Sequence, residues 1–212
     1  MRLRLSAKNA GARLDKILAR YGESGRGAGF WVSPSAQPDN LDQLLKKRAL
    51  HCRKYFPAMY CDLEKPLPDV HARVPVQFAR VTDYKIFRAQ PHPAIGYITT
   101  TIRRFELAAQ EHLALRSPRK SWEFVATCAN SPVGICTLFL GRRHAGVFDV
   151  GVLEPVRNQG IGRALVRHAC AFAREQGSEG AILIATNLGY GMYRHVGFQE
   201  VGRIGFWYTA HP

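Results

Sequence analysis

The stretch of sequence that decides the fold reads VFDVGVLEPVRNQGIGRALV and spans residues 147–166. Its first part, Val147–Leu153, is rich in valine and predicts a β-strand. A turn containing one proline and two glycines follows, and a long helix then continues to about Gln176. Apolar residues at three- and four-residue spacing predict that helix, and they are Ile161, Leu165, Ala169, Phe172 and Ala173. Gly177 stands where a helix commonly ends in a glycine.

The turn between this strand and this helix has the composition of an anion-binding site. The first N–H groups of a helix have no acceptor within the helix, and the helix dipole places partial positive charge there. Gly160 and Gly162 carry no Cβ atom, so a phosphate can approach the backbone closely. Arg157 and Arg163 flank the glycines and can neutralise phosphate charge. A pyrophosphate fits this arrangement better than a lone carboxylate; plain turn glycines are the alternative interpretation.

Two common phosphate-binding motifs do not match this turn. A Rossmann fingerprint needs a third glycine, and the chain has Leu165 at that position. A Walker A loop needs Gly-Lys-Ser/Thr, which is absent. The form Arg157-x-x-Gly160-x-Gly162 instead resembles the acetyl-CoA signature of the GNAT superfamily of N-acetyltransferases.

The sequence after the helix strengthens the resemblance to GNAT proteins. An apolar run of strand length, Ala181–Ala185, is followed by Asn187 and then by Tyr193-Arg-His-Val-Gly-Phe198. This order is similar to the closing pattern of the superfamily: a strand, a polar residue, a short helix with a tyrosine, and Gly-Phe before the last strand. The resemblance covers about residues 73–208.

The resemblance implies acetyl-CoA as cosubstrate and direct transfer of its acetyl group to a primary amine. Backbone groups of Val150 and Val152 would pair with the pantetheine arm, and an N–H near Val152 would polarise the thioester carbonyl. Tyr193 would protonate the departing thiolate, although a core aromatic is the alternative. Asn187 would bind the pantetheine region or cap the next helix. The amides that would hold the pyrophosphate, beside Arg157, belong to Asn158, Gln159, Gly160, Ile161, Gly162, Arg163 and Ala164.

The sequence offers no obvious general base. GNAT proteins often use a glutamate on the strand before the glycine-rich turn, and this strand has Asp149 instead. In an ideal strand Asp149 shares a face with Gly151, but a β-bulge would change that parity. Glu106 and Glu111 lie on the preceding predicted helix, where the acceptor pocket of the superfamily usually lies, and solvated positions are the alternative for both. The missing base keeps a non-catalytic CoA-binding module open as a second function.

Outward from this stretch, the sequence predicts an α/β protein with a mixed, mostly antiparallel central sheet flanked by helices. Residues 73–212 form the expected acetyltransferase domain. Residues 1–70 form an N-terminal α/β portion that resembles the degenerate N-terminal portion of some two-part GNAT proteins. Further strands are predicted at about residues 30–33, 58–63, 74–81, 122–127, 133–140, 181–185 and 201–208, and further helices at about 7–22, 39–50, 102–115 and 189–195.

The amino-acid composition limits which kinds of partner the chain can have. The net charge of +14 favours anionic partners, but no dense run of lysine and arginine is present, so a basic RNA-associated protein is the weaker alternative. No apolar run is long enough for a membrane span. The five cysteines are scattered without a CxxC pair, so neither a metal site nor a disulfide framework is predicted. We expect a cytoplasmic protein, either monomer or homodimer.

Overall fold

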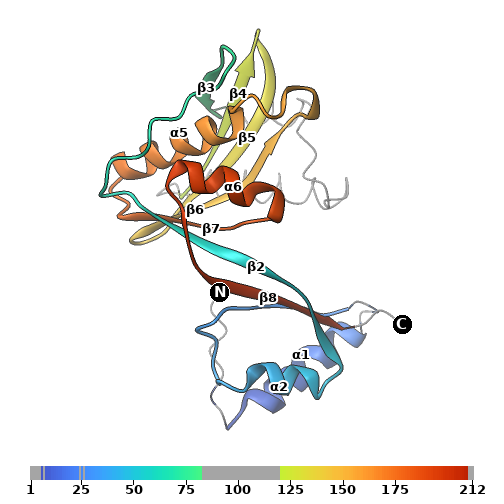
Figure 1. Cartoon of the computed structure of the whole chain (residues 1–212). Helices are drawn as coiled ribbons and strands as arrows, with labels where there is room; N and C mark the ends of the chain where they lie inside the picture. The colour runs from blue at the N-terminus through green and yellow to red at the C-terminus, as the bar shows by residue number, and fades with distance from the viewer. Residues whose placement is uncertain (1–5, 7, 24, 26, 83–119, 210–212) are drawn as a thin grey trace. The chain divides into compact units, whose positions relative to one another are not determined.

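The computed structural model describes residues 6, 8–23, 25, 27–82 and 120–209. The chain divides into two compact units (Figure 1). One comprises Met1–Ala58 with Glu200–Pro212, and the other comprises Met59–Gln199. The division into residues 1–70 and 73–212 expected from the sequence stays a prediction.

Eight strands among the described residues are hydrogen-bonded in the order β1-β8-β2-β7-β6-β5-β4-β3. Neighbouring strands in β1–β8 and from β3 to β6 run antiparallel, whereas β6 and β7 run parallel. The predicted mixed, mostly antiparallel sheet is therefore confirmed. The strands are β1 (Gly29–Val32), β2 (Leu50–Asp62), β3 (Gln77–Arg80), β4 (Ser121–Cys128), β5 (Ser131–Leu140), β6 (His144–Val152), β7 (Gly180–Ile184) and β8 (Gln199–Thr209).

The strands predicted at about residues 122–127 and 133–140 form a hairpin, β4 and β5. Its two-residue turn, Ala129-Asn130, has positive φ at both positions, which is the geometry that matches the twist of antiparallel strands. Asparagine tolerates this conformation well, and alanine does so at some cost in strain. Alternate residues of the two strands then face α5, and Phe124 and Leu138 are fully buried.

Helix α5 (Ile161–Glu175) covers one face of β4, β5 and β6, and it also contacts α6 (Asn187–Val196) (Figure 1). The apolar stripe predicted from the sequence is buried in the core of this unit, except that Phe172 is half-buried at its edge. Gly177 ends the helix with a φ of 82°, as expected. The stripe therefore fixes α5 on the sheet, and the end of β6 feeds directly into its first turn through a 3₁₀ turn, Glu154–Val156.

The other unit is built from α1 (Ala10–Glu23), α2 (Leu41–Lys46), β1, and parts of β2 and β8. Leu14, Leu45, Leu50 and Trp207 form its small core. Asp15 of α1 accepts hydrogen bonds from the Arg48 guanidinium, with 2.6 Å between Asp15 Oδ1 and Arg48 Nε. This unit thus has its own apolar centre and its own polar contact, which joins α1 to the turn after α2.

Several predicted element boundaries are wrong. Helix α2 ends at Lys46, because Ala49 has a positive φ and β2 already begins at Leu50. Strand β3 lies at the edge of the sheet and begins late, at Gln77, as Pro75 within the predicted strand suggests, since proline cannot donate to a sheet ladder. The predicted helix 102–115 lies outside the described residues.

Candidate active site

Strand β6 separates from β7 halfway along its length. The parallel pairing joins only His144–Gly146 to Gly180–Ile182. From Val147 to Val152, β6 has no strand partner on that side among the described residues. We call this side of Val147–Val152 the open edge of β6.

Backbone groups of Val152 point to the open edge. The N–H of the next residue, Leu153, donates to the Val133 carbonyl on the β5 side over 2.8 Å. Adjacent residues of a strand direct their backbone groups to opposite sides, so those of Val152 point away from β5. The Arg157 side chain confirms this direction, because its Nε donates to the Val152 carbonyl over 3.0 Å.

A β-bulge in β6 turns Asp149 away from the core. The register with β5 shifts between Ile135 and Thr137, and Asp149 has a φ of 50°. The extra residue changes the parity of the strand. Val147, Val150 and Val152 consequently all pack against the core under α5, although the first two are three positions apart in sequence. Asp149 therefore lies with Phe148 on the opposite face of the sheet, and the bulge considered from the sequence is present.

The start of α5 is a glycine-rich turn without a side-chain cap. Asn158 and Gly160 both have left-handed backbone conformations, with φ of 63° and 78°. No side chain caps the helix at Gly160. The first hydrogen bond of the helix is the one that the Ala164 N–H donates to the Gly160 carbonyl, over 3.1 Å. The N–H groups of Ile161, Gly162 and Arg163 precede that bond and have no acceptor within the helix. We call residues 157–163 the cradle.

Protein atoms lie close to both glycines of the cradle. A Cβ atom at Gly160 would lie 2.9 Å from the His71 carbonyl oxygen. A Cβ atom at Gly162 would lie 2.9 Å from the Sδ atom of Met192 on α6. From the sequence, the absence of Cβ atoms at these two positions was explained only by access for a phosphate. In the structure their absence also allows two other segments to pack closely against the helix start.

The Arg163 side chain supplies a donor to the cradle. A Cβ atom at Gly160 would lie 3.1 Å from Arg163 Nε, so the guanidinium lies beside the turn. That Nε is buried and has no hydrogen-bond partner among the described residues. A buried donor without a partner is costly, and a phosphate oxygen at the helix start would satisfy it. The residues present thus fit a phosphate group.

A segment from a distant part of the sequence crosses the start of α5, and we call residues 68–76 the strap. The Arg73 N–H donates to the Gln159 carbonyl over 2.7 Å. Arg167 Nε donates to the Pro68 carbonyl over 2.8 Å. The sequence interpretation missed the strap, because the strap contributes only backbone groups to these two hydrogen bonds, and backbone groups leave no sequence pattern.

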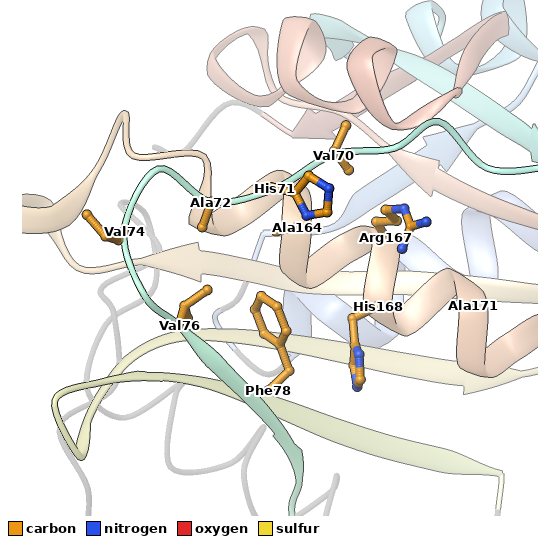
Figure 2. A pocket seen from close by; sticks show the side chains of 10 residues that line it. All are labelled: Val70, His71, Ala72, Val74, Val76, Phe78, Ala164, Arg167, His168 and Ala171. Atoms are coloured by element: carbon orange, nitrogen blue, oxygen red, sulfur yellow. The ribbon is translucent and has the colours of Figure 1, made fainter.

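A groove of about 330 Å³ lies between the strap and the outer face of α5 (Figure 2). The Phe78 and His168 rings stack at 5.3 Å between centroids on its floor. Burial lowers the pKa of His168, so its ring stays neutral at neutral pH. The lining residues are Val70, His71, Ala72, Val74, Val76, Phe78, Ala164, Arg167, His168 and Ala171.

Tyr193 and Asn187 both lie on α6. The Tyr193 ring is buried next to Gly189 and 5.9 Å from the Phe198 ring, measured between centroids. Thr186 caps α6 by accepting the Gly189 N–H, so the capping role considered for Asn187 is wrong. Asn187 is exposed in the first turn of the helix. Its role toward a pantetheine arm, and the acid role of Tyr193, stay predictions.

The sequence interpretation also missed Glu123 of β4, which is only 1% exposed. Burial, followed by the nearby Asp149 carboxylate, raises the pKa of Glu123 to about 8. Ser121 Oγ donates to Glu123 Oε1 over 3.0 Å. A charged residue amid the apolar run Trp122–Val125 was the available signal, since such positions are rarely charged unless the charge is used.

Glu106 and Glu111, which the sequence also offered as titratable candidates, lie outside the described residues. His195 is exposed, and its Nδ1 lies 2.6 Å from the Gly191 carbonyl within the same helix.

Among the described residues, no helix is long and apolar enough to cross a membrane.

The fold and the site together define an α/β protein in which one parallel strand pair separates beside a helix start suited to phosphate. Comparison with known proteins agrees with this geometry. The family model of the acetyltransferase (GNAT) domain matches residues 120–200. Residues 120–200 are therefore a GNAT acetyltransferase domain.

Curated relatives carry related names. The chain is 32% identical over 116 residues to N-acetyltransferase 8F1 of Rattus norvegicus, which covers 50% of this chain and 51% of that protein. It is 43% identical over 95 residues to N-acetyltransferase family 8 member 3 of the same organism, covering 41% of each. The chain thus spans about half of the length of these relatives or less.

Solved structures share the fold. GCN5-related N-acetyltransferases from Kribbella flavida and Sphaerobacter thermophilus have TM-scores of 0.66 and 0.68, each with 17% identity. The alignments cover 98% and 96% of this chain, and 78% and 70% of those chains. At this identity the likeness shows the fold alone, and it extends over both compact units.

Proposed function

We propose that this chain transfers the acetyl group of acetyl-CoA to a primary amine. The open edge of β6, next to the uncapped start of α5 and the buried Nε of Arg163, is the observation that carries the proposal. An extended pantetheine arm can pair with an open strand edge. The helix start lies at the end of the same strand, where the arm would reach its diphosphate.

Named groups of this chain would each perform one task. The cradle amides and Arg163 would hold the diphosphate. Backbone groups of Val150 and Val152 would align the arm, with Arg157 holding the Val152 carbonyl in place. Acetyl-CoA supplies an activated thioester, and Tyr193 would give a proton to the sulfur that leaves. The names of the relatives, all N-acetyltransferases, support nitrogen as the acceptor atom.

We further propose that residues 1–70 are a degenerate GNAT-like portion and that the protein works in the cytoplasm. The fold likeness to a tandem GNAT protein from the clavulanic acid biosynthesis pathway covers 95% of this chain, with a TM-score of 0.64 and 15% identity. This portion has no Arg-x-x-Gly-x-Gly motif of its own. All five cysteines are free thiols, which is typical of a reducing compartment.

Two measurements test the function. Acetyl-CoA should raise the melting temperature of the protein, because a ligand that binds only the folded state stabilises it. Thiol release from acetyl-CoA should then be followed over a panel of aliphatic amines, aminoglycosides and peptide N-termini. No thermal shift at millimolar acetyl-CoA would contradict the proposal. A clear shift with no thiol release from any amine would favour a CoA-binding module without catalysis.

A further inference from the structure

Aromatic rings line one face of the sheet in the unit that contains α1 and α2. Phe30 on β1 and Trp207 on β8 are register partners, and both pack in the core that these two helices cover. The neighbouring register partners, Trp31 and Phe206, therefore point to the opposite face, because adjacent residues of a strand alternate between faces. Tyr208 lies two positions after Phe206 and shares its face. We call this side of β1, β8 and β2 the outer face.

The rings of the outer face form one continuous row, which we call the aromatic row. The Phe56 and Trp31 ring centroids are 5.4 Å apart, and those of Trp31 and Phe206 are 4.9 Å apart. The Tyr208 ring follows Phe206 at 6.3 Å, with an angle of only 8° between the two ring planes. Trp31 is 56% exposed. The solvated face of an antiparallel sheet normally carries polar residues, so a row of rings that reaches the surface indicates a binding surface.

Cations lie at both ends of the aromatic row. The Lys54 Nζ atom is 5.2 Å from the centroid of the Phe56 ring, and the Arg53 guanidinium carbon is 5.6 Å from that of the Tyr208 ring. Both cationic residues are exposed. The sequence of this unit has 13 lysine and arginine residues against 5 aspartate and glutamate residues, an excess of +8 within a chain of +14. The net positive charge is therefore concentrated in this unit, and it favours an anionic partner.

Three kinds of partner use exposed aromatic rings, and the charges of this surface select among them. A second copy of the chain would bring the same positive unit against itself, and the repulsion of like charges opposes that contact. A membrane would bury the two cations together with the rings, although charged groups are costly to remove from water. A single-stranded nucleic acid meets both requirements, because its bases stack on aromatic rings and its phosphates pair with cations.

We propose that the outer face binds single-stranded nucleic acid, with bases stacked on Trp31 and Phe206 and with phosphates held by Arg53 and Lys54. Aromatic side chains on the face of a sheet are a recurring platform for unpaired bases. The sequence alone did not favour such a partner, because it has no dense run of lysine and arginine. In the structure the rings and the cations come together from three strands, β1, β2 and β8, and no such run is needed. The inference does not depend on the proposed acetyl transfer.

Fluorescence anisotropy with labelled oligonucleotides tests the binding, at a length of about 12 nucleotides, which lies within the usual site size of a single-strand binding surface. The protein should bind oligo-uridylate and oligo-thymidylate, and should bind a duplex of the same length more weakly, because paired bases are not free to stack. A preference for the RNA would identify RNA as the partner, since only RNA has a 2′-hydroxyl group. Equal or tighter binding of the duplex, or no binding of either single strand, would overturn the proposal.

Variants of Trp31 test the aromatic row. Trp31→Ala should weaken oligonucleotide binding about tenfold, which is within the loss expected for one stacked base. Trp31→Phe keeps an aromatic ring and should bind nearly as the wild type does. Tyr21→Ala, which removes an exposed ring from α1 of the same unit, is the matched control and should leave the affinity unchanged. Unchanged affinity in Trp31→Ala, or an equal loss in Tyr21→Ala, would contradict the role of the row.

Tryptophan fluorescence gives a second readout, which needs no destabilising variant. Of the three tryptophans of the chain, Trp31 is 56% exposed, Trp207 is buried, and Trp122 belongs to the other unit. A base stacked on Trp31 should quench the emission of the wild type when an oligonucleotide is added. Trp31→Phe should remove this quenching while the anisotropy still reports binding. Quenching that persists in Trp31→Phe would place the oligonucleotide elsewhere on the protein and overturn the proposed site.

The salt dependence of the affinity tests the two cations. Arg53→Gln combined with Lys54→Gln should reduce the slope of log affinity against log salt concentration by about 1.4, because two fewer phosphates of a single strand are neutralised. Lys16→Gln combined with Arg20→Gln removes the same charge from exposed positions on α1, on the helix-covered side of the sheet. This control pair should leave the slope nearly unchanged. Equal slopes in the two double variants would overturn the phosphate contacts.

Three further measurements exclude other partners and another site. Binding to vesicles that contain phosphatidylserine, in a protein that binds no oligonucleotide, would assign the outer face to membranes instead. A dimer in sedimentation equilibrium that Trp31→Ala dissociates, again without oligonucleotide binding, would assign it to a second copy of the chain. Saturating acetyl-CoA should not displace the oligonucleotide, because the cradle belongs to the other compact unit. Displacement would assign the oligonucleotide to the cradle and overturn the proposal.

Discussion

The guanidinium of Arg157 and the carbonyl of Val152 form a hydrogen bond of 3.0 Å, which joins the first residue of the Arg-x-x-Gly-x-Gly motif to the last residue of β6. The motif arginine thus organises protein backbone as well as carrying charge. It holds the end of the strand in register with the start of the helix. Its loss should therefore affect the pantetheine arm and the diphosphate together.

Arg157→Ala should weaken acetyl-CoA binding about tenfold, equivalent to about 1.4 kcal/mol, because it removes a charged donor and frees the Val152 carbonyl. Isothermal titration calorimetry measures the change. Arg174→Ala, which removes an arginine from the last turn of α5, should bind like the wild type. Equal affinity in the two variants would show that the bond to Val152 has no role in binding.

Gly160→Ala should destabilise the protein more than Gly177→Ala does. Both glycines have a left-handed conformation, with φ of 78° and 82°, which costs an alanine about 1–2 kcal/mol. Only at Gly160 would the added Cβ also meet a backbone oxygen, at 2.9 Å; Gly177 faces open space. Urea unfolding of both variants isolates the cost of the contact between the added Cβ and the His71 carbonyl oxygen. Equal losses of unfolding free energy in the two variants would show that the strap moves aside at no cost.

Gly162→Ala should destabilise by an amount that depends on Met192. The added methyl group would lie 2.9 Å from Met192 Sδ, the end of a flexible side chain. In a double-mutant cycle with Met192→Ala, the two changes should therefore cost less together than the sum of the single changes. Additive costs would mean that the methionine moves aside without difficulty.

The stability of the protein should fall as the pH rises from about 4.5 to 8. In this window the folded protein holds the Glu123 proton, whose pKa is raised to about 8, whereas the unfolded chain has released it at its ordinary value of 4.5. The free energy of unfolding then decreases with pH by up to about 1.4 kcal/mol per unit. Glu123→Gln should flatten this slope in urea unfolding at pH 5, 6, 7 and 8.

Tyr193→Phe should slow acetyl transfer with little loss of acetyl-CoA affinity. The substitution keeps the ring that packs beside Gly189 and Phe198 and removes only the hydroxyl group. Steady-state kinetics and calorimetry on the same preparation separate the two effects. Unchanged turnover would remove Tyr193 from the mechanism.

The parts of the site that follow local sequence patterns could be predicted. The helix stripe, the glycine-rich turn and the C-terminal Gly177 depend on neighbours in sequence, so α5 and its start were placed correctly. The bulge at Asp149 depends on how β5 and β6 twist together, which no alternation within one strand reveals. Glu123 lies on β4 and Asp149 on β6, so their electrostatic influence on each other depends on strand pairing that the sequence alone could not show.

The peptide unit between Gln159 and Gly160 carries a further consequence. Its carbonyl is taken by the Arg73 N–H, and because a trans peptide is planar, its own N–H must then point the opposite way. The direction of the Gly160 N–H, one donor of the cradle, is thus set by the main-chain nitrogen of Arg73, which lies more than eighty positions earlier in the sequence. A proline at position 73 has no N–H group, so it would remove this hydrogen bond and release the peptide unit of Gln159 and Gly160 while every motif residue stayed intact.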